Sequence, residues 1–385
     1  MAVIAVSVCS AKIALSADGF VELGTALPLT GAYERSGADT KNGYDLAIRQ
    51  LNAKGGIDVR GKRYYFKLRY YDDRSDPISA QEQVERLIHA DGVNFILGPY
   101  RGGRNLAVLS TVERHRIPMV DAHSVVQATG LDSKRYSFAV AATPSQYLSA
   151  AVRFAASISD KFGKQVNDLR IALATNNDPF SREVREGALS EAKRLGMTSI
   201  IDDQFANGSA DISGTLDRIK ELKPDLFLVS GHESAAKSTV LQIERSGAKV
   251  PMVALTHCRT ARLAEEQPGA SAKVFCPAEW APKAPYKGVL FGTGEDFAQL
   301  YNDAYGHDPS SVAAQAATAI IVFANAMERA QSLETEKVRD AVSATNLMTF
   351  LGPIKFDDRG VNRAVSRVLP TSSAGGGVPG VPVID

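Results

Sequence analysis

Short runs of apolar residues alternate with longer amphipathic segments from residue 21 onward. Val21 to Leu27 predicts a strand, and Gly37 to Lys54 carries apolar residues at helical spacing. Asp76 followed by Pro77 marks the start of another helix, because aspartate caps helices and proline suits the first helical position. The same rhythm predicts strands at 64–71, 94–97, 118–120, 169–174, 198–201, 226–229 and 252–255, and helices at 105–115, 143–163, 178–195, 212–222 and 233–246.

This order of elements is typical of parallel βαβ units. The strands are apolar throughout rather than alternating, as expected when helices cover both faces of a sheet. Two series, near 21–121 and 169–276, therefore predict an α/β protein with two doubly wound, parallel-sheet lobes. We also expect a mostly helical section at 293–344, a short strand pair at 354–356 and 366–369, and a poorly ordered tail from 372.

The N-terminal segment, Met1 to Ala17, is apolar and rich in small residues, which resembles a signal peptide cleaved after Ala17. No positive residue precedes its apolar run and Lys12 interrupts it, so an ordinary disordered tail is the alternative. The later apolar run Thr318–Ala326 is too short to span a bilayer. These features predict a secreted protein that does not itself span the membrane.

Composition narrows the class of protein. The 385 residues include 44 basic and 43 acidic side chains, for a formal net charge of +1. Such a chain lacks the basic surface that binds nucleic acid, so we expect no nucleic-acid partner. The cysteines Cys9, Cys258 and Cys276 have neither redox-pair nor zinc-site spacing. If Cys9 is removed with the N-terminal segment, the other two form either a disulfide or two separate buried thiols.

Catalytic motifs are missing from the sequence. The chain contains no G-x-S-x-G elbow, no H-E-x-x-H pair and no G-x-x-x-x-G-K-[ST] phosphate loop. The glycine-rich stretch Gly98–Gly103 lacks the spacing of a dinucleotide site. The adjacent acidic pairs Asp72–Asp73 and Asp357–Asp358 fit turns better than acid–base chemistry. We therefore expect no enzymatic activity, no cofactor and no metal.

An ordered set of motifs carries a family resemblance. Its members are GTALPLTGAYERSG (24–37), LNAKGGI (51–57), YDDRSDP (71–77), ILGPYRG (96–102), RIPMVDA (116–122) and LGPIKFDDRG (351–360). Each motif is weak alone, but the set in this order covers nearly the whole mature chain. It resembles the leucine/isoleucine/valine-binding protein family, the type I periplasmic binding proteins that serve as substrate-binding components of ABC transporters.

The resemblance implies two lobes joined by three crossovers, near 140–144, 276–280 and 348–353. Each lobe would then be discontinuous in sequence. Residues 18–141 and 279–349 would form lobe 1, residues 142–278 and 350–371 lobe 2, and residues 372–385 a flexible tail. A small carboxylate or amino acid would bind between the lobes by hinge closure, and the closed form would dock on the permease subunits of an ABC importer.

Candidate ligand-binding loops follow from the fold class alone. In open α/β sheets ligands bind beyond the carboxyl ends of the strands. Two facing lobes therefore place the loops after their strands in one cleft. These loops are 29–37, 99–104, 121–126, 176–180, 231–233 and 256–259.

The resemblance assigns residues within these loops. Ser36 stands in the place of a ligand-facing aromatic residue. Arg101 and Gly102 lie in a loop whose serine and backbone amide hold a ligand carboxylate in the family. The next loop, which holds the α-carboxylate and α-amine there, matches His123, Ser124 and Val125.

The second lobe contributes the remaining candidates. Phe180 and His232 match ligand-facing aromatic residues of the family, and Thr256 or His257 falls near an acidic residue that pairs with the ligand amine. This chain departs from the family at three places. Gly102 stands where the family has the carboxylate-binding serine, and Val125 stands where it has a threonine that helps to hold the ligand's α-carboxylate and α-amine. Neither Thr256 nor His257 is an acid. A buried ammonium without a carboxylate partner is costly, which argues against an α-amino acid ligand.

The loops offer basic and aromatic side chains instead. Arginine binds a planar carboxylate through two hydrogen bonds, which suits Arg101 and Arg104. Phe180, Tyr100 and Trp280 could stack on a ring. We therefore expect an aromatic or apolar acid without an amine, with a branched-chain amino acid as the other choice.

Each candidate also has a structural alternative. The arginines fit surface charges, the histidines fit structural hydrogen bonds, Phe180 fits a packing residue at a helix start, and Trp280, at a proposed crossover, fits a structural role. A ligand-sensing receptor domain with the same fold is the alternative function. The sequence does not name the ligand or the permease.

Overall fold

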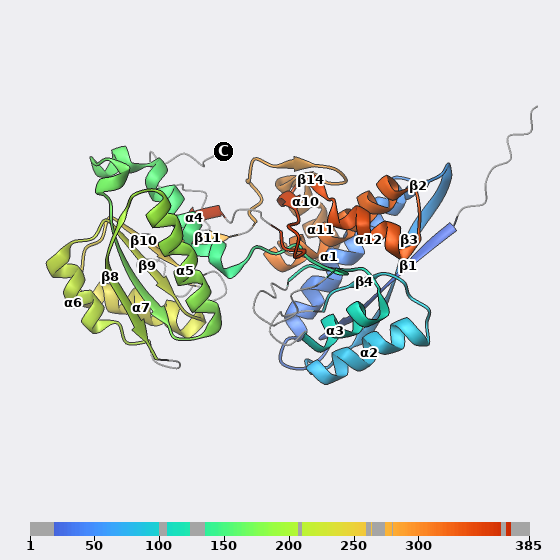
Figure 1. Ribbon diagram of the computed structural model, residues 1–385, viewed down its shortest axis with the longest axis horizontal. Coiled ribbons are helices and arrows are strands. Elements are labelled where there is room, and N and C mark those ends of the chain that lie inside the picture. Colours follow the sequence, from blue (N-terminus) through green and yellow to red (C-terminus); the bar gives the residue numbers. More distant parts are fainter. Residues whose placement is uncertain are drawn as a thin grey trace, which may run out of the picture.

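The computed structural model has two α/β lobes that lie side by side along the long axis of the molecule (Figure 1). It describes residues 19–99, 106–123, 135–206, 210–258, 263, 274–278, 280–362 and 367–370. Each lobe is built on a six-stranded sheet, with strand orders β2-β3-β1-β4-β5-β6 and β16-β11-β10-β9-β7-β8. The prediction of two doubly wound lobes is confirmed.

The first sheet is parallel except at one edge. β1 pairs in parallel with β3 and β4, and β2 pairs antiparallel with β3 as an added edge strand. β2 and β6, the two edge strands of this sheet, were not predicted from the sequence. The strands are β1 (Gly19–Leu27), β2 (Ile57–Val59), β3 (Lys62–Asp72), β4 (Ile96–Leu97), β5 (Met119–Asp121) and β6 (Ser137–Ala139).

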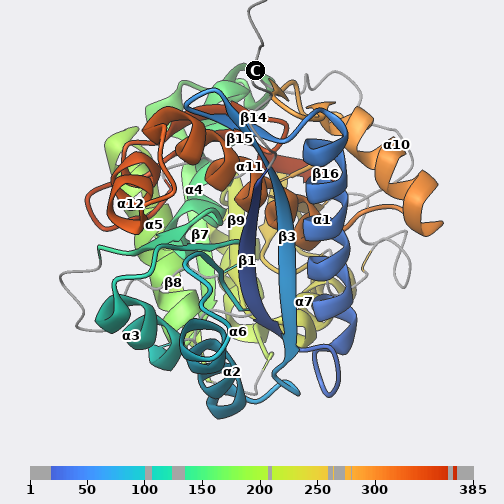
Figure 2. The same cartoon turned by 90° about the vertical axis from the view of Figure 1, so that its right-hand side faces the viewer.

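Helices cover both faces of this sheet. On one face, α1 (Glu34–Ala53) and α11 (Ser311–Ala330) share a hydrophobic cluster with alternate strand residues such as Leu23 and Leu97. On the other face, α2 (Pro77–His89) and α3 (Leu106–His115) share a second cluster with Ile96 and Met119. Figure 2, which looks at this lobe end-on, shows α1 flanking β3 on one side and α2 and α3 grouped on the other.

α11 is longer than the apolar run Thr318–Ala326 at its centre. Among the described residues it is the one helix that by length and composition alone could cross a membrane. Most of its residues are buried within the lobe, including Ile320, Phe323 and Met327. This burial is typical of a core helix. α10 (Gly294–Tyr305) and α12 (Thr335–Ser343) complete the lobe.

The second lobe repeats the plan. α4 (Pro144–Ser157) and α5 (Pro179–Arg194) pack on one face of its sheet, and α6 (Ser213–Leu222) and α7 (Glu233–Ser246) on the other. Neighbouring residues of β9 divide between the two faces, as with Phe227 and Leu228. The strands are β7 (Arg170–Asn176), β8 (Thr198–Phe205), β9 (Leu226–Ser230), β10 (Met252–Leu255), β11 (Val274–Ala278) and β16 (Arg367–Pro370).

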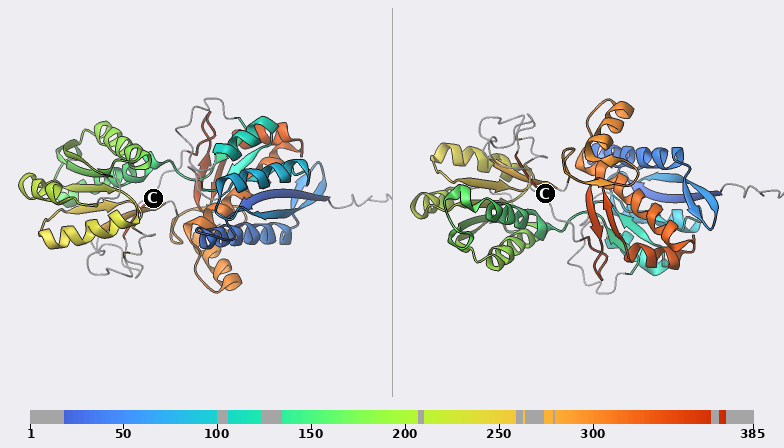
Figure 3. Two further views of the ribbon diagram at one scale, coloured as in Figure 1. Left: turned by 90° about the horizontal axis from the view of Figure 1, so that it is seen from below. Right: turned by 90° about the horizontal axis from the view of Figure 1, so that it is seen from above.

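Three segments of the chain connect the lobes, one after β6, one after β11 and one between β15 and β16. Figure 3 shows connecting segments that run between the two lobes. The first and third connecting segments lie side by side. Ala139 donates its amide to the carbonyl of Gly360 at 2.8 Å, and the Asn362 side-chain amide donates to the Val140 carbonyl at 2.9 Å. Asn362 is fully buried at this junction.

Both strands predicted near the C-terminus are present, but they do not pair with each other. β15 (Gly352–Lys355) pairs with β14 (Asn346–Thr349), and β16 joins the second sheet beside β11. The β14–β15 hairpin packs into the first lobe, where Phe350 and Ile354 are fully buried. The third connecting segment therefore lies after Lys355, C-terminal to the expected 348–353. A second small hairpin, β12 (Lys287–Gly288) and β13 (Gly292–Thr293), lies nearby. The lobe boundaries stay a prediction.

Candidate functional site

Four rings meet at the carboxyl ends of the strands of the second lobe. Phe180 lies with its ring centroid 5.0 Å from that of His257, 5.7 Å from that of Tyr147 and 6.0 Å from that of His232. The two imidazole centroids are 5.2 Å apart. His232 is exposed and the other three are half-buried. Sequence reasoning proposed three of these residues as ligand contacts, and the fold brings them together.

Local sequence explains how these rings are presented. Asp178 caps α5 by accepting the amide of Ser181 at 3.0 Å, which places Phe180 in the first turn, just beyond the end of β7. His232 is the N-cap residue of α7, directly after β9. His257 follows β10 with φ of 58°, a left-handed conformation that turns the chain away from the strand. Phe180, His232 and His257 therefore each follow a parallel strand, whereas Tyr147 lies in the first turn of α4.

The first turn of α5 also carries a carboxylate that sequence reasoning read only as a cap. Asp178 is 8% exposed, and its Oδ2 lies 3.6 Å from Nε2 of His232. Among the described residues, other buried polar atoms with no hydrogen-bond partner lie close by in the chain. They are Asn176 Oδ1, Ser181 Oγ and Ser230 Oγ. These groups give the edge of the ring cluster hydrogen-bonding capacity that the chain does not use.

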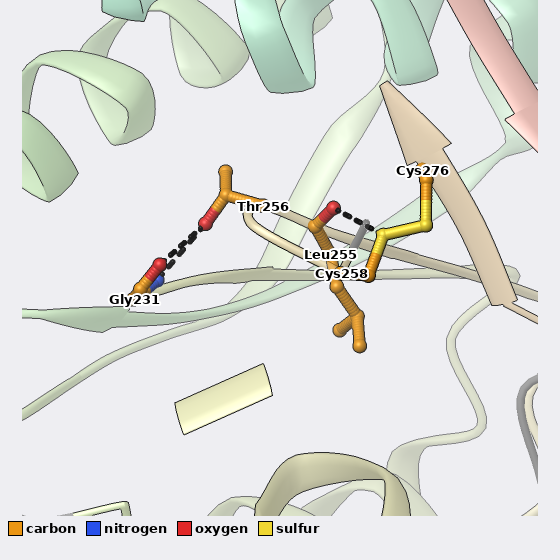
Figure 4. The surroundings of a disulfide bond; sticks show 5 residues. All are labelled: Gly231, Leu255, Thr256, Cys258 and Cys276. Atoms are coloured by element: carbon orange, nitrogen blue, oxygen red, sulfur yellow. Dashed lines mark hydrogen bonds between the residues drawn. A yellow bond between two sulfur atoms is a disulfide. The ribbon is translucent and has the colours of Figure 1, made fainter. Parts of the chain in front are cut away.

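Thr256 has a structural role in the same region. Its hydroxyl donates to the carbonyl of Gly231 at 2.8 Å and accepts the Gly231 amide at 3.1 Å, which joins the ends of β9 and β10 (Figure 4). Two residues further on, Cys258 forms a disulfide with Cys276 of β11. The disulfide, one of two alternatives left open by the sequence, ties the loop that carries His257 to a neighbouring strand.

The first lobe contributes a second polar group, built around His123. Its Nε2 lies 3.1 Å from Oγ1 of Thr40, and its Nδ1 lies 3.1 Å from Oε1 of Gln315. The same Thr40 hydroxyl donates to the carbonyl of Ser36 at 2.8 Å. Two predicted site residues, Ser36 and His123, are therefore linked through Thr40. Burial lowers the pKa of His123 to about 4, so the ring is neutral at physiological pH.

Thr40 and Gln315 were not predicted as part of the site. Gln315 is 8% exposed and stands in an otherwise apolar, alanine-rich stretch of α11, which is the signal that could have identified it. Thr40 lies one helical turn after Ser36 and faces the same side of α1.

The loop between β1 and α1 is held by the loop after β3. Asp72 accepts the amide of Leu29 at 3.0 Å and the hydroxyl of Thr30 at 2.7 Å. Ser75 accepts the amide of Tyr33 at 3.0 Å and donates to the Thr30 carbonyl at 2.8 Å. The YDDRSDP motif therefore fixes the start of α1, which carries Ser36.

Trp280 is buried rather than presented. It is 1% exposed and packs edge-on against Phe297 of α10, with centroids 5.8 Å apart, inside the core of the first lobe. This position favours the structural role. The other predicted contacts lie outside the described residues, namely Tyr100, Arg101, Gly102, Arg104, Ser124 and Val125.

A groove of about 1080 Å³ lies elsewhere on the second lobe. Its lining includes Lys223, Gly247 and Pro251, from the C-terminal ends of α6 and α7 and from the starts of the strands. The groove therefore lies at the amino-terminal ends of the strands, opposite the ring cluster. Ligands of open α/β sheets bind at the carboxyl ends, so we assign the groove no role in ligand binding.

Two doubly wound lobes, with rings and polar groups at the carboxyl ends of their strands, define a two-lobed binding protein. A family model described as "Periplasmic binding protein" matches residues 21–372, and the chain belongs to this family. The predicted family resemblance is confirmed, and membership implies an extracytoplasmic location.

Relatives and solved structures agree with this assignment. A "Leu/Ile/Val-binding protein homolog 7" of Brucella suis biovar 1 is 23% identical over 368 residues, which cover 92% of this chain and 89% of that protein. The branched-chain amino acid transporter substrate binding protein LivJ of Streptococcus pneumoniae, in complex with isoleucine, has a TM-score of 0.66 and 17% identity. That match covers 91% of this chain and 99% of LivJ.

A third comparison concerns a different ligand. A solute binding protein of an ABC transporter from R. palustris, in complex with benzoate, has a TM-score of 0.63 and 16% identity. The match covers 91% of this chain and 96% of that one. Identities this low show a shared fold only.

Proposed function

We propose that this protein is the extracytoplasmic solute-binding component of an ABC importer and that it binds a small organic acid with a ring or another apolar body. The ring cluster of Tyr147, Phe180, His232 and His257 is the observation that carries this proposal. Aromatic rings favour offset or edge-on contacts with another ring, and the cluster stands where α/β lobes bind ligands.

The polar groups around the rings favour an acid. His232 can donate a hydrogen bond to a carboxylate, and the predicted contacts Arg101 and Arg104 would add charge from the first lobe. Asp178 is the carboxylate that would suit a ligand amine, but its Oδ1 caps α5 and its Oδ2 faces His232. Benzoate, found in the R. palustris protein, is the simplest ligand of the proposed class.

Binding would close the lobes about the three connecting segments. A ligand that contacts the rings of one lobe and the His123 group of the other stabilises only the closed form. A shift from 1:99 to 99:1 in favour of that form needs about 5.5 kcal/mol of differential affinity. Charge-assisted hydrogen bonds and one buried ring together reach this magnitude.

The remaining parts of the role follow from this mechanism. The closed form would dock on the permease subunits, and the protein would release its ligand unchanged, without catalysis. Residues 1–17 would direct secretion to the periplasm as a signal peptide. They lie outside the described residues.

A thermal-shift screen of the purified protein tests the ligand class. Benzoate and dihydroxybenzoate should stabilise the protein, and a ligand at 100 times its Kd should add about 2.7 kcal/mol. The variant Phe180→Ala should weaken benzoate binding at least about tenfold. Phe20→Ala is the matched control, because Phe20 is 59% exposed at the start of β1.

Isoleucine and leucine are the decisive competitors. Stabilisation by these amino acids but not by benzoate would overturn the amine-free ligand and would identify Asp178 as the partner of the ammonium group. An equal benzoate affinity in Phe180→Ala would overturn the ring cluster as the binding site.

A further inference from the structure

Three side chains with metal-binding atoms converge on the outer face of the first lobe. They are Glu85 and His89 of α2 and His115 of α3. Glu85 and His89 are four residues apart, so they share one face of their helix. The two histidines are the last residues of neighbouring helices, which Figures 1 and 2 show side by side.

The ligand atoms form a compact triangle. Nε2 of His89 lies 3.3 Å from Nε2 of His115 and 3.2 Å from Oε2 of Glu85, and Nε2 of His115 lies 3.1 Å from the same oxygen. In a tetrahedral zinc site with bonds of 2.0–2.1 Å, the ligand atoms are about 3.3 Å apart. The triangle therefore has the dimensions of one face of such a site.

Hydrogen bonds alone do not account for this arrangement. Each neutral imidazole carries one N–H, so two rings supply at most two protons to three short contacts. If both Nε2 atoms carry protons, these protons face each other across the 3.3 Å gap. A bound cation satisfies all three lone pairs at once.

Neighbouring groups orient the carboxylate. The hydroxyl of Thr111 donates to Oε1 of Glu85 at 2.9 Å, and Arg114 donates to the same oxygen. Oε2 is thereby directed at the histidines, an outer-shell arrangement common in metal sites. Arg114 Nε also lies 3.4 Å from His115 Nε2, where it would have to yield to a metal.

We propose that Glu85, His89 and His115 form a binding site for a divalent transition metal of the zinc class. Two imidazoles and one carboxylate are a known zinc ligand set that leaves the fourth position to water. The metal would tie the ends of α2 and α3 together. α2 follows β3 and α3 follows β4, so both helices begin near the carboxyl ends of the strands, where the solute site is proposed. Their last residues therefore lie at the opposite, amino-terminal end of the strands.

Zinc titration of tag-free, chelator-treated protein by calorimetry tests this site. We expect one zinc per chain and a higher Tm with zinc. His89→Ala and His115→Ala should each weaken zinc binding at least about tenfold and abolish the Tm rise. The control His307→Ala removes an exposed histidine outside the triangle and should bind as the wild type does.

Cobalt provides a readout of geometry. Co²⁺ in the wild type should give the strong visible absorption of a tetrahedral site, and His89→Ala should lose it. No zinc uptake, or uptake of equal affinity in His89→Ala and His115→Ala, would overturn the proposal. The solute screen is independent, since neither histidine belongs to the ring cluster.

Discussion

Nδ1 of His257 lies 2.8 Å from the carbonyl oxygen of Gly231, where the loops after two neighbouring strands meet. A carbonyl only accepts, so Nδ1 carries the proton of this hydrogen bond. The contact fixes the ring beside Phe180 and joins the β9 and β10 loops. The geometry of the second-lobe site therefore rests on backbone groups as well as on side chains.

Substitutions at His257 should separate binding from folding. His257 has φ of 58°, which asparagine adopts readily and β-branched residues do not. We expect His257→Asn to weaken benzoate binding at least about fivefold with little change in Tm, because it removes the ring and keeps the backbone. His257→Val should lower the Tm. Full benzoate affinity in His257→Asn would place the ligand elsewhere.

The disulfide should contribute to both stability and binding. It closes a loop between residues 18 apart in sequence, which corresponds to about 3 kcal/mol of unfolding free energy. Urea unfolding of the wild type should therefore shift on reduction, whereas the double variant Cys258→Ala/Cys276→Ala should not respond to reductant. We also expect this variant to bind benzoate more weakly, since the disulfide anchors the His257 loop. Identical unfolding of both proteins without reductant would contradict this.

His123 should make the protein sensitive to acid. Burial lowers its pKa in the folded state to about 4, whereas the unfolded chain takes up the proton near pH 6.5. This stability is fully present above pH 6.5 and is lost as the pH falls towards 4. Between pH 7.5 and 4.5 the wild type should lose about 2 to 3 kcal/mol more than His123→Gln. Urea unfolding at both values measures this, and a variant with the same loss as the wild type would contradict it.

Close packing of α1 on α11 should make Gly43 intolerant of a side chain. An added Cβ at Gly43 would meet the Ala313 carbonyl oxygen and the Cβ of Ala316, the latter at 2.9 Å. We expect Gly43→Ala to cost about 1 to 3 kcal/mol despite the better helix propensity of alanine. Gly214→Ala in α6 is the control, because its Cβ would meet open space. Equal unfolding midpoints in the two variants would contradict the packing.

Much of the fold could be predicted from local sequence. The periods of apolar residues and the caps at Asp76 and Asp178 located most helices and strands, because burial and capping are set by residues close in sequence. The strand-end rule also selected the loops 176–180, 231–233 and 256–259, and the family resemblance assigned Phe180, His232 and His257 within them. The edge strands β2 and β6 were not predicted, whereas the equally short central strands β4 and β5 were.

Pairings between distant segments were decided only by the tertiary structure. The sequence did not reveal that Cys258 and Cys276 pair, that β16 returns to the second sheet, or that Trp280 enters a lobe core. His89 and His115 are 26 residues apart, outside any metal-motif spacing. Local patterns state which face of an element is buried, but which faces meet depends on how helices pack across a sheet. The sequence by itself therefore determined the α/β class and the loops of the site, and packing decided which side chains meet there.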